Sequence, residues 1–166
     1  MEIRQATAAD LDAVGEIFAH YVTHTVITFM ETPPTPAEWH RKLTELTGLR
    51  LPFLVAETDG RVVGFATASP WRTQPAYRHT AENSIYLSPG HTGRGLGRAL
   101  LDALLARCAE AGVRQLIAVI ADTGDNGASP ALHRAFGFTD AGRLTAVGHK
   151  QGRWLDTLLL QRDLSR

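Results

Sequence analysis

The sequence predicts an α/β protein in which helices pack against one central sheet. Two patterns of apolar residues support this class. Short runs of alternating or continuous apolar residues are typical of strands. Between them lie longer segments whose apolar residues recur every three to four positions, which is typical of helices. Neither a repeat nor a linker interrupts the 166 residues, so we expect a single domain covering residues 1–166.

The first third of the chain predicts a strand and two helices. Residues 2–6 (EIRQA) form a short strand, and residues 7–10 (TAAD) are a capping-box-like start for the first helix. The apolar stripe of this helix consists of Leu11, Val14, Ile17, Phe18 and Tyr21. The second helix has a stronger start, because Thr35 caps it, Pro36 suits its first position and Glu38 reaches back to the cap.

The middle of the chain predicts three strands and a helix. Two β-rich runs within residues 52–70 are joined by an Asp-Gly dipeptide, a pair typical of hairpin turns. Residues 81–88 (AENSIYLS) form another strand. A helix follows over residues 97–111, with its apolar residues on one stripe, and Gly112 ends it.

The last third predicts a strand, a short helix and a closing pair of strands. Residues 114–121 (RQLIAVIA) have the continuous apolar run of a strand that is buried on both faces, as in a parallel pair. The segment SPALHRAF predicts a helix with Ser129 as its N-cap and Pro130 at its first position. Residues 142–147 and 154–161 predict an antiparallel pair. The predicted order is therefore β-α-α-β-β-β-α-β-α-β-β.

Charge and cysteine content limit the classes of partner. Lys and Arg number 17, as do Asp and Glu, so no net field attracts nucleic acid or an anionic membrane, and we expect neither as a partner. The single cysteine, Cys108, excludes an intramolecular disulfide and fits a reducing compartment. The sequence starts with charged residues and lacks the apolar stretch of a signal peptide, so we expect a cytoplasmic protein.

A glycine-rich segment links the fourth predicted strand to the third predicted helix. Four glycines fall within residues 90–97. A P-loop would need Lys and then Ser or Thr after its last glycine, but Leu96 follows Gly95, and a dinucleotide fingerprint would need glycine where Arg98 stands. Bare backbone N–H groups at a helix N-terminus, with Arg94 and Arg98 beside them, favour a phosphate or pyrophosphate. The alternative is that the glycines serve only to make a tight turn.

The residues in and around this segment resemble the sequence motifs of a known family. SPGHTGRGLGRALL resembles the acyl-CoA pyrophosphate loop of the GNAT superfamily, with the signature Gln/Arg-x-x-Gly-x-Gly/Ala. Gly95 and Gly97 match its paired glycines, whereas Thr92 stands at the Gln/Arg position. Seven further segments are similar to the phosphinothricin N-acetyltransferase branch of this superfamily, which includes enzymes for methionine sulfoximine and methionine sulfone. They are IRQATAADL, TPAEW, PFLVAE, ATASPWR, TAENSIYLSP, LHRAFGF and HKQGRWLDT. The resemblance implies the GNAT fold, with a mixed and mostly antiparallel sheet, and acetyl-CoA as co-substrate without a metal.

The resemblance also implies roles for particular residues. Glu82 stands where the family places its catalytic base, and His133 stands where many members have a tyrosine that protonates the leaving thiolate. A histidine without a role on the helix surface is the alternative for His133. The predicted cofactor-binding residues are Leu87 (through its backbone N–H), Thr92, Gly93, Arg94, Gly95, Leu96, Gly97, Arg98, Asn126 and Ser129. For Ser129, helix capping alone is the alternative.

Two arginines lie just before the predicted base. Arg72 and Arg78 suit a carboxylate together with a second anionic or strongly polar oxygen group. Phe29 and Tyr77 are predicted to wall the hydrocarbon part of the acceptor, with packing as the alternative. Met30 stands where the phosphinothricin enzymes carry an arginine, and the loss of this cation predicts a preference for the less charged sulfur analogues over the phosphinate.

Together these features predict an enzyme that transfers the acetyl group of acetyl-CoA directly to the α-amine of a small amino-acid-like substrate. Two alternatives remain open. One is a protein or peptide N-terminal acetyltransferase on the same fold, and the other is a non-catalytic acyl-CoA-binding module. The resemblance implies a homodimer. His20 and His24 are spaced to bind a metal, but no third ligand is evident, so no metal site is expected.

Overall fold

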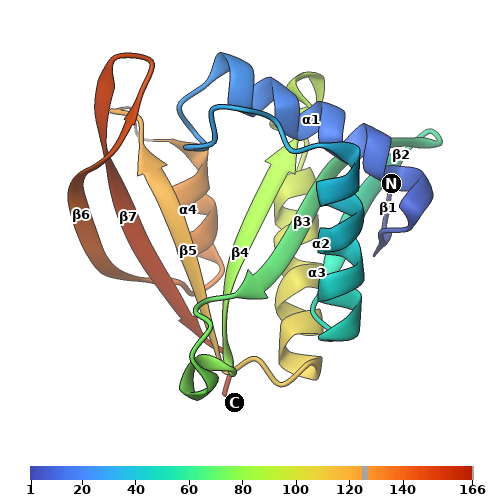
Figure 1. Ribbon diagram of the computed structural model, residues 1–166. Helices are drawn as coiled ribbons and strands as arrows, with labels where there is room; N and C mark the ends of the chain where they lie inside the picture. The colour runs from blue at the N-terminus through green and yellow to red at the C-terminus, as the bar shows by residue number, and fades with distance from the viewer. Residues whose placement is uncertain (125–126, 166) are drawn as a thin grey trace.

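The computed structural model describes residues 1–124 and 127–165, and the order of strands and helices is the predicted one (Figure 1). The strands are β1 (Glu2–Gln5), β2 (Phe53–Thr58), β3 (Arg61–Pro70), β4 (Thr80–Leu87), β5 (Gln115–Asp122), β6 (Thr139–Lys150) and β7 (Arg153–Asp163). The α-helices are α1 (Leu11–His24), α2 (Pro36–Gly48), α3 (Leu96–Glu110) and α4 (Ala128–Ala135). Short 3-10 turns are η1 (Ala8–Asp10), η2 (Pro75–Tyr77) and η3 (Pro89–His91).

The strands form one sheet in the order β1-β2-β3-β4-β5-β7-β6. β4 and β5 pair in parallel, and the other described neighbours pair antiparallel. The prediction of a mixed, mostly antiparallel sheet is therefore confirmed. The continuous apolar run of β5 is explained by its central place between β4 and β7.

The helices cover both faces of the sheet and make two separate cores. On one face, α1 and α2 pack their apolar stripes on aromatic residues of β2 and β3, around Trp39, Phe53 and Phe65. On the other face, the buried stripe of α3, including Leu100 and Leu104, packs on β2, β3 and β5. Cys108 belongs to this second core and is fully buried.

Local signals in the sequence start the helices, with one exception. Thr35 and Glu38 form the predicted capping box, with the Glu38 N–H donating to the Thr35 hydroxyl at 3.2 Å. The prediction that Ser129 caps α4 is wrong. α4 begins at Ala128 with Gly127 as its N-cap, so Ser129 lies inside the first turn of the helix. The chain adopts the cap conformation two residues earlier than the capping preference of serine suggested.

The C-terminal strands are longer than predicted. β6 contains register shifts between Asp140 and Gly142 and between Leu144 and Gly148, so its pairing with β7 continues past irregular positions. Within the described residues, no helix is long and apolar enough to span a membrane.

Candidate active site

β4 and β5 separate halfway along their length. Their parallel pairing runs from Thr80 opposite Gln115 to Asn83 opposite Ala118. Beyond this point β4 continues to Leu87 and β5 continues to Asp122, and Figure 1 shows the two strands diverging. Backbone groups on the facing edges of the diverging halves have no strand partner there, so an extended ligand can take that place.

The backbone N–H of Leu87 points to this opening. The N–H of Ser88 donates to the carbonyl oxygen of Val63 on β3 at 2.8 Å. Because successive residues of an antiparallel strand direct their backbone groups to opposite sides, the N–H of Leu87 points away from β3. The carbonyl oxygen of Leu87 accepts a hydrogen bond from the Tyr21 hydroxyl, which joins α1 to the end of β4.

The glycine-rich loop follows β4 and leads into α3. Gly93 and Gly95 have φ values of +73° and +80°, and Gly95 is the N-cap of the helix. A Cβ atom added at Gly95 would meet no atom within 4 Å, so it is the left-handed backbone and not crowding that favours glycine there. Arg94 and Arg98 are exposed beside the free N–H groups of the first helical turn. The loop therefore has the features of an anion site at a helix N-terminus.

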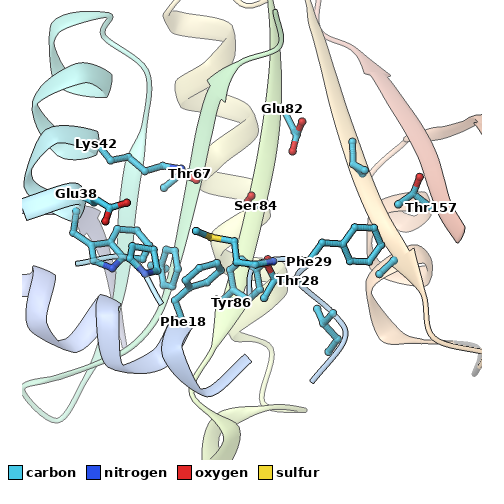
Figure 2. Close-up of a pocket in the computed structure, with 17 residues that line it drawn as sticks. Phe18, Thr28, Phe29, Glu38, Lys42, Thr67, Glu82, Ser84, Tyr86 and Thr157 are labelled. Carbon is cyan, nitrogen blue, oxygen red and sulfur yellow. The ribbon is translucent and has the colours of Figure 1, made fainter. Parts of the chain in front are cut away.

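A cavity of about 400 Å³ lies on the other side of β4, beneath α1 and α2. Figure 2 shows Glu82 and Ser84 of β4 and Thr67 of β3 along one part of it, with Lys42 approaching from α2. Apolar side chains also line it, including Ile27, Phe29, Met30, Val119 and Ala121. The cavity thus combines charged and apolar groups, which is typical of sites for small amphiphilic molecules.

Glu82 lies in the charged part of this cavity. It pairs with Ile117 of β5, one position before the last parallel pair, so it lies next to the place where the strands separate. Burial raises the pKa of Glu82 above its usual range, and the positive charges of Lys42 and Arg72 partly offset this rise. A carboxylate whose pKa is moved toward neutral is suited to accept a proton.

Lys42 was not among the residues predicted for the site. It lies on α2, three residues after the buried Trp39, which places both on the side of the helix that faces the sheet. Burial lowers the pKa of Lys42, while the carboxylates of Glu45 and Glu82 raise it. A lysine on the buried stripe of an amphipathic helix was the available signal in the sequence, but sequence alone did not show that this stripe faces Glu82.

His133 is buried, with 4% of its surface exposed, so the alternative of a surface histidine is wrong. Its Nδ1 lies 2.7 Å from the carbonyl oxygen of Ser129, which only accepts, so Nδ1 carries a proton. Its Nε2 accepts from the Asn83 amide at 3.0 Å. Burial lowers the pKa of His133, which favours this neutral form. The Oδ1 atom of Asn83 is buried and has no hydrogen-bond partner within the described part of the chain.

The segment between α1 and α2 forms one wall of the cavity and is held against β6. The Lys150 ammonium, buried on β6, donates to the carbonyl oxygen of Thr28 at 2.7 Å. The ring of Phe29 lies over Gly148, where an added Cβ would come within 2.4 Å of the ring. Only glycine allows this approach, and it fixes Phe29 in the cavity wall.

The remaining predicted residues are not all brought together. Arg72 lies in an adjoining cavity of about 600 Å³, which shares Lys42 and Glu38 with the first. Its guanidinium stacks on the Trp71 ring at 4.1 Å from the ring centroid. Tyr77 and Arg78 are exposed in and after η2, and neither lines these two cavities. Asn126 lies outside the described residues.

Metal ligation has little support in the parts of the chain that are described. No group of three or more His, Cys, Asp and Glu side chains is placed to hold a metal ion among residues 1–124 and 127–165. The rings of His20 and His24 lie 5.2 Å apart on α1.

A sheet with two diverging parallel strands, a glycine-rich anion loop after the first of them and a carboxylate beside the gap define an acyl-CoA-dependent transferase fold. Residues 17–138 match the family model described as Acetyltransferase (GNAT) family. The chain belongs to this GNAT acetyltransferase family.

Curated relatives cover almost the whole chain. It is 45% identical over 163 residues to the phosphinothricin N-acetyltransferase of Alcaligenes faecalis, covering 98% of this chain and 82% of the relative. It is 38% identical over 167 residues to the L-methionine sulfoximine/L-methionine sulfone acetyltransferase of Salmonella typhimurium, covering 99% of this chain and 95% of the relative.

Solved structures agree. The phosphinothricin acetyltransferase of Sinorhizobium meliloti in complex with AcCoA matches with a TM-score of 0.92 and 47% identity, over 98% of this chain and 87% of that one. A ribosomal-protein-alanine N-acetyltransferase from Brucella melitensis matches with a TM-score of 0.93 and 40% identity, over 98% and 99% of the two chains.

Proposed function

We propose that this protein transfers the acetyl group of acetyl-CoA to the α-amine of a small amino acid of the phosphinothricin, methionine sulfoximine or methionine sulfone type. Two relatives named for such compounds share 45% and 38% of its residues over nearly its full length. The observation that carries the proposal is the place of Glu82. This half-buried carboxylate lies in a cavity of substrate size, on the strand that leads directly into the anion loop.

In the proposed reaction, the acceptor ammonium first loses a proton to Glu82 through a water molecule. The free amine nitrogen then attacks the thioester carbon, so that an N–C bond forms and the carbonyl oxygen becomes anionic. The backbone N–H of Leu87, which points to the gap between β4 and β5, donates to that oxygen. When the C–S bond breaks, CoA leaves as the thiolate. The nitrogen, which is positively charged after the attack, releases its excess proton to water, which can pass it to the thiolate, and the neutral amide remains. Transfer is direct, within one ternary complex.

The glycine-rich loop is the proposed binding site of the CoA diphosphate. The first N–H groups of α3 follow the N-cap Gly95 and have no partner within the helix, and the left-handed Gly93 and Gly95 place no side chain beside them. Arg94 and Arg98 add positive charge, so that the diphosphate is held by side chains as well as by backbone N–H groups.

For His133 the geometry favours a positioning role over the predicted role of acid. Its Nδ1 proton is held by the Ser129 carbonyl oxygen, and its Nε2 accepts from Asn83. A neutral imidazole in this state has no proton on Nε2 to give to a thiolate. We infer that His133 fixes Asn83 at the point where β4 and β5 separate, whereas its action as an acid stays a prediction.

Two arginines remain proposed acceptor-binding residues. Arg72 lies beside the shared boundary of the two cavities and its charge reaches Glu82, so it is placed to hold an oxygen group of the acceptor. Arg78 and Tyr77 lie further away, and their role stays a prediction. Phe29 lines the apolar part of the cavity, as its predicted contact with the hydrocarbon part of the acceptor requires.

A homodimer in a reducing cytoplasm completes the proposal. The β6–β7 hairpin exposes Leu144, Val147 and Trp154, the last with 72% of its surface accessible, and such an apolar surface suits a second copy of the chain. Burial raises the pKa of the Cys108 thiol to about 12, so this thiol stays protonated and poorly reactive at neutral pH. Analytical ultracentrifugation of the wild type would test the dimer.

The second candidate is acetylation of protein N-termini, which the similarity to the Brucella melitensis structure favours. The test is a comparison of kcat/KM for phosphinothricin, L-methionine sulfoximine, L-methionine sulfone, ordinary amino acids and a peptide bearing a ribosomal-protein N-terminus, all with acetyl-CoA. We expect the free amino acids to be preferred. A higher kcat/KM for the peptide would favour the second candidate, and acetyl-CoA binding without turnover of any acceptor would favour a non-catalytic module.

A further inference from the structure

We propose that Lys42 binds the α-carboxylate of the acceptor and thereby restricts the enzyme to free amino acids. This inference rests on the proposed function, and it names the residue that recognises the α-carboxylate common to all the proposed acceptors. Arg72, which lines the adjoining cavity, is then left to bind another group of the acceptor.

The charges of the cavity match a zwitterion. Among its described lining residues, the charged ones are Glu38, Lys42 and Glu82. Glu38 is engaged with Thr35, whose hydroxyl donates to its Oε1 at 3.1 Å. This leaves one carboxylate, Glu82, for an ammonium and one ammonium, Lys42, for a carboxylate. A free α-amino acid carries both of these charges, whereas a peptide N-terminus carries only the ammonium.

Lys42 is placed to reach such a ligand. Figure 2 shows its side chain extending from α2 toward Thr67, on the same side of the sheet as Glu82. Among the described residues, its ammonium makes no hydrogen bond or ion pair, although the side chain is half-buried. A partly desolvated ammonium without an acceptor costs free energy, and this cost is relieved when a carboxylate binds to it.

The spacing of groups in an α-amino acid supports the same assignment. Its amine and its carboxylate are attached to one carbon atom, so the groups that bind them must be neighbours. Glu82 and Lys42 are neighbours in this sense, because they line the same cavity from β4 and α2 (Figure 2) and the charge of each acts on the other. Thr67 lies between them on β3 and offers a hydroxyl to the same ligand.

With its amine and carboxylate held by Glu82 and Lys42, the acceptor places its side chain against other residues that line the cavity. The apolar ones include Phe29, Met30 and Val119, which suit a methylene chain with a neutral sulfur-containing end. An anionic phosphinate would pay the cost of desolvation among these apolar side chains without a cation to pair with it. The Lys42 assignment therefore predicts a preference for methionine sulfone and methionine sulfoximine over phosphinothricin.

The test uses two acceptors that differ only at the carboxyl group, L-methionine sulfone and its α-carboxamide. Values of kcat and KM are measured at saturating acetyl-CoA, at a pH where Glu82 is ionised in all variants. The variants are Lys42→Met, which keeps length without charge, Lys42→Arg, which restores a cation, and Lys42→Gln, a second neutral form. Arg41→Met is the matched control, because Arg41 is an exposed cation on the same helix that borders the adjoining cavity of Arg72 but does not line the cavity of Glu82.

We expect Lys42→Met and Lys42→Gln to raise KM for the sulfone by about 10- to 100-fold, the usual effect of losing a hydrogen bond to a charged group. Their KM for the carboxamide stays within about 3-fold of the wild type, since this acceptor has no anion to lose. Lys42→Arg recovers much of the preference for the sulfone, and Arg41→Met keeps all of it. Calorimetry gives an unchanged Kd for acetyl-CoA in every variant.

Two results would overturn the assignment. One is a preference for the sulfone over the carboxamide that survives in both neutral Lys42 variants. The other is the loss of that preference in Arg72→Ala but not in Lys42→Met, which would give the carboxylate to Arg72. Absence of acetyl transfer by the wild type to any free amino acid would instead contradict the proposed function itself, so the two failures are distinguishable.

Discussion

Glu82, Ser84 and Tyr86 point from β4 into the cavity beneath α1 and α2, whereas Asn83 points to the other face, toward His133 of α4. The first face is built of side chains that come from distant parts of the sequence, including Lys42 and Phe29. The second face leads to the glycine-rich loop, where backbone N–H groups form the binding surface.

This difference explains how the two sites relate to the sequence. A site made of backbone leaves a local and compact signature, because glycine is needed wherever the chain takes a left-handed conformation or must stay uncovered. A site made of side chains from several elements leaves no such signature, because its members are neighbours only after folding. The predictions below disturb one face at a time.

The largest effect is expected on the cavity face, at Glu82. Glu82→Gln keeps the shape of the side chain but removes its ability to accept a proton, so kcat/KM should fall by about 10²-fold or more at neutral pH. Steady-state kinetics with L-methionine sulfone measure this change. The Kd for acetyl-CoA should remain that of the wild type, because the carboxylate lies outside the loop. Unchanged turnover from neutral to mildly alkaline pH would show that Glu82 is not the base.

The next effect is expected on the loop face. Gly95→Val places a β-branched side chain at a φ of +80° and in the space proposed for the diphosphate, so the Kd for acetyl-CoA should rise by roughly 10- to 50-fold. Gly60→Val is the matched control, since Gly60 has a φ of +73° and open surroundings but lies in the β2–β3 turn. It should lower thermal stability by a similar amount and leave the Kd unchanged. Tight acetyl-CoA binding by a folded Gly95→Val protein would contradict the proposed role of the loop.

A smaller effect is expected where the cavity wall meets β6. An alanine Cβ at Gly148 would lie 2.4 Å from the Phe29 ring, so Gly148→Ala must displace that ring and the segment that carries it. We expect KM for the acceptor to rise by about 5- to 10-fold and the melting temperature to fall by several degrees, with acetyl-CoA affinity retained. Gly48→Ala, where an added Cβ meets no atom within 4 Å, is the control and should change none of these values. Equal behaviour of the two variants would show that the Phe29 contact does not shape the cavity.

The smallest effect is a shift in the pH dependence. Burial raises the pKa of Glu82, and the cations Lys42 and Arg72 lower it in part. A base must be ionised, so kcat/KM rises with pH through this pKa. Removing a cation raises the pKa further, and the rising limb in Lys42→Met should therefore move to higher pH by roughly half a unit. The limb in Arg41→Met should stay in place, and a shift to lower pH in Lys42→Met would contradict the electrostatic coupling.

The sequence by itself determined the order of the elements, the capping box of α2 and the anion loop before α3, because each of these depends on residues that are close together in the chain. It also indicated Glu82 as the candidate base, because the residues around it resemble a motif of the GNAT family. Local preference misled the prediction at Ser129, where α4 begins two residues earlier than a serine cap implies.

The tertiary structure alone decided which side chains share the cavity. Lys42 and Glu82 are 40 positions apart in the sequence and lie on different elements, so no periodicity relates them. The burial of His133 and its two hydrogen bonds likewise depend on how α4 packs against β4. The physical reason is that solvation and charge at a site are set by everything packed around it, and residues distant in the chain become neighbours only when the sheet brings α2, β4 and α4 together.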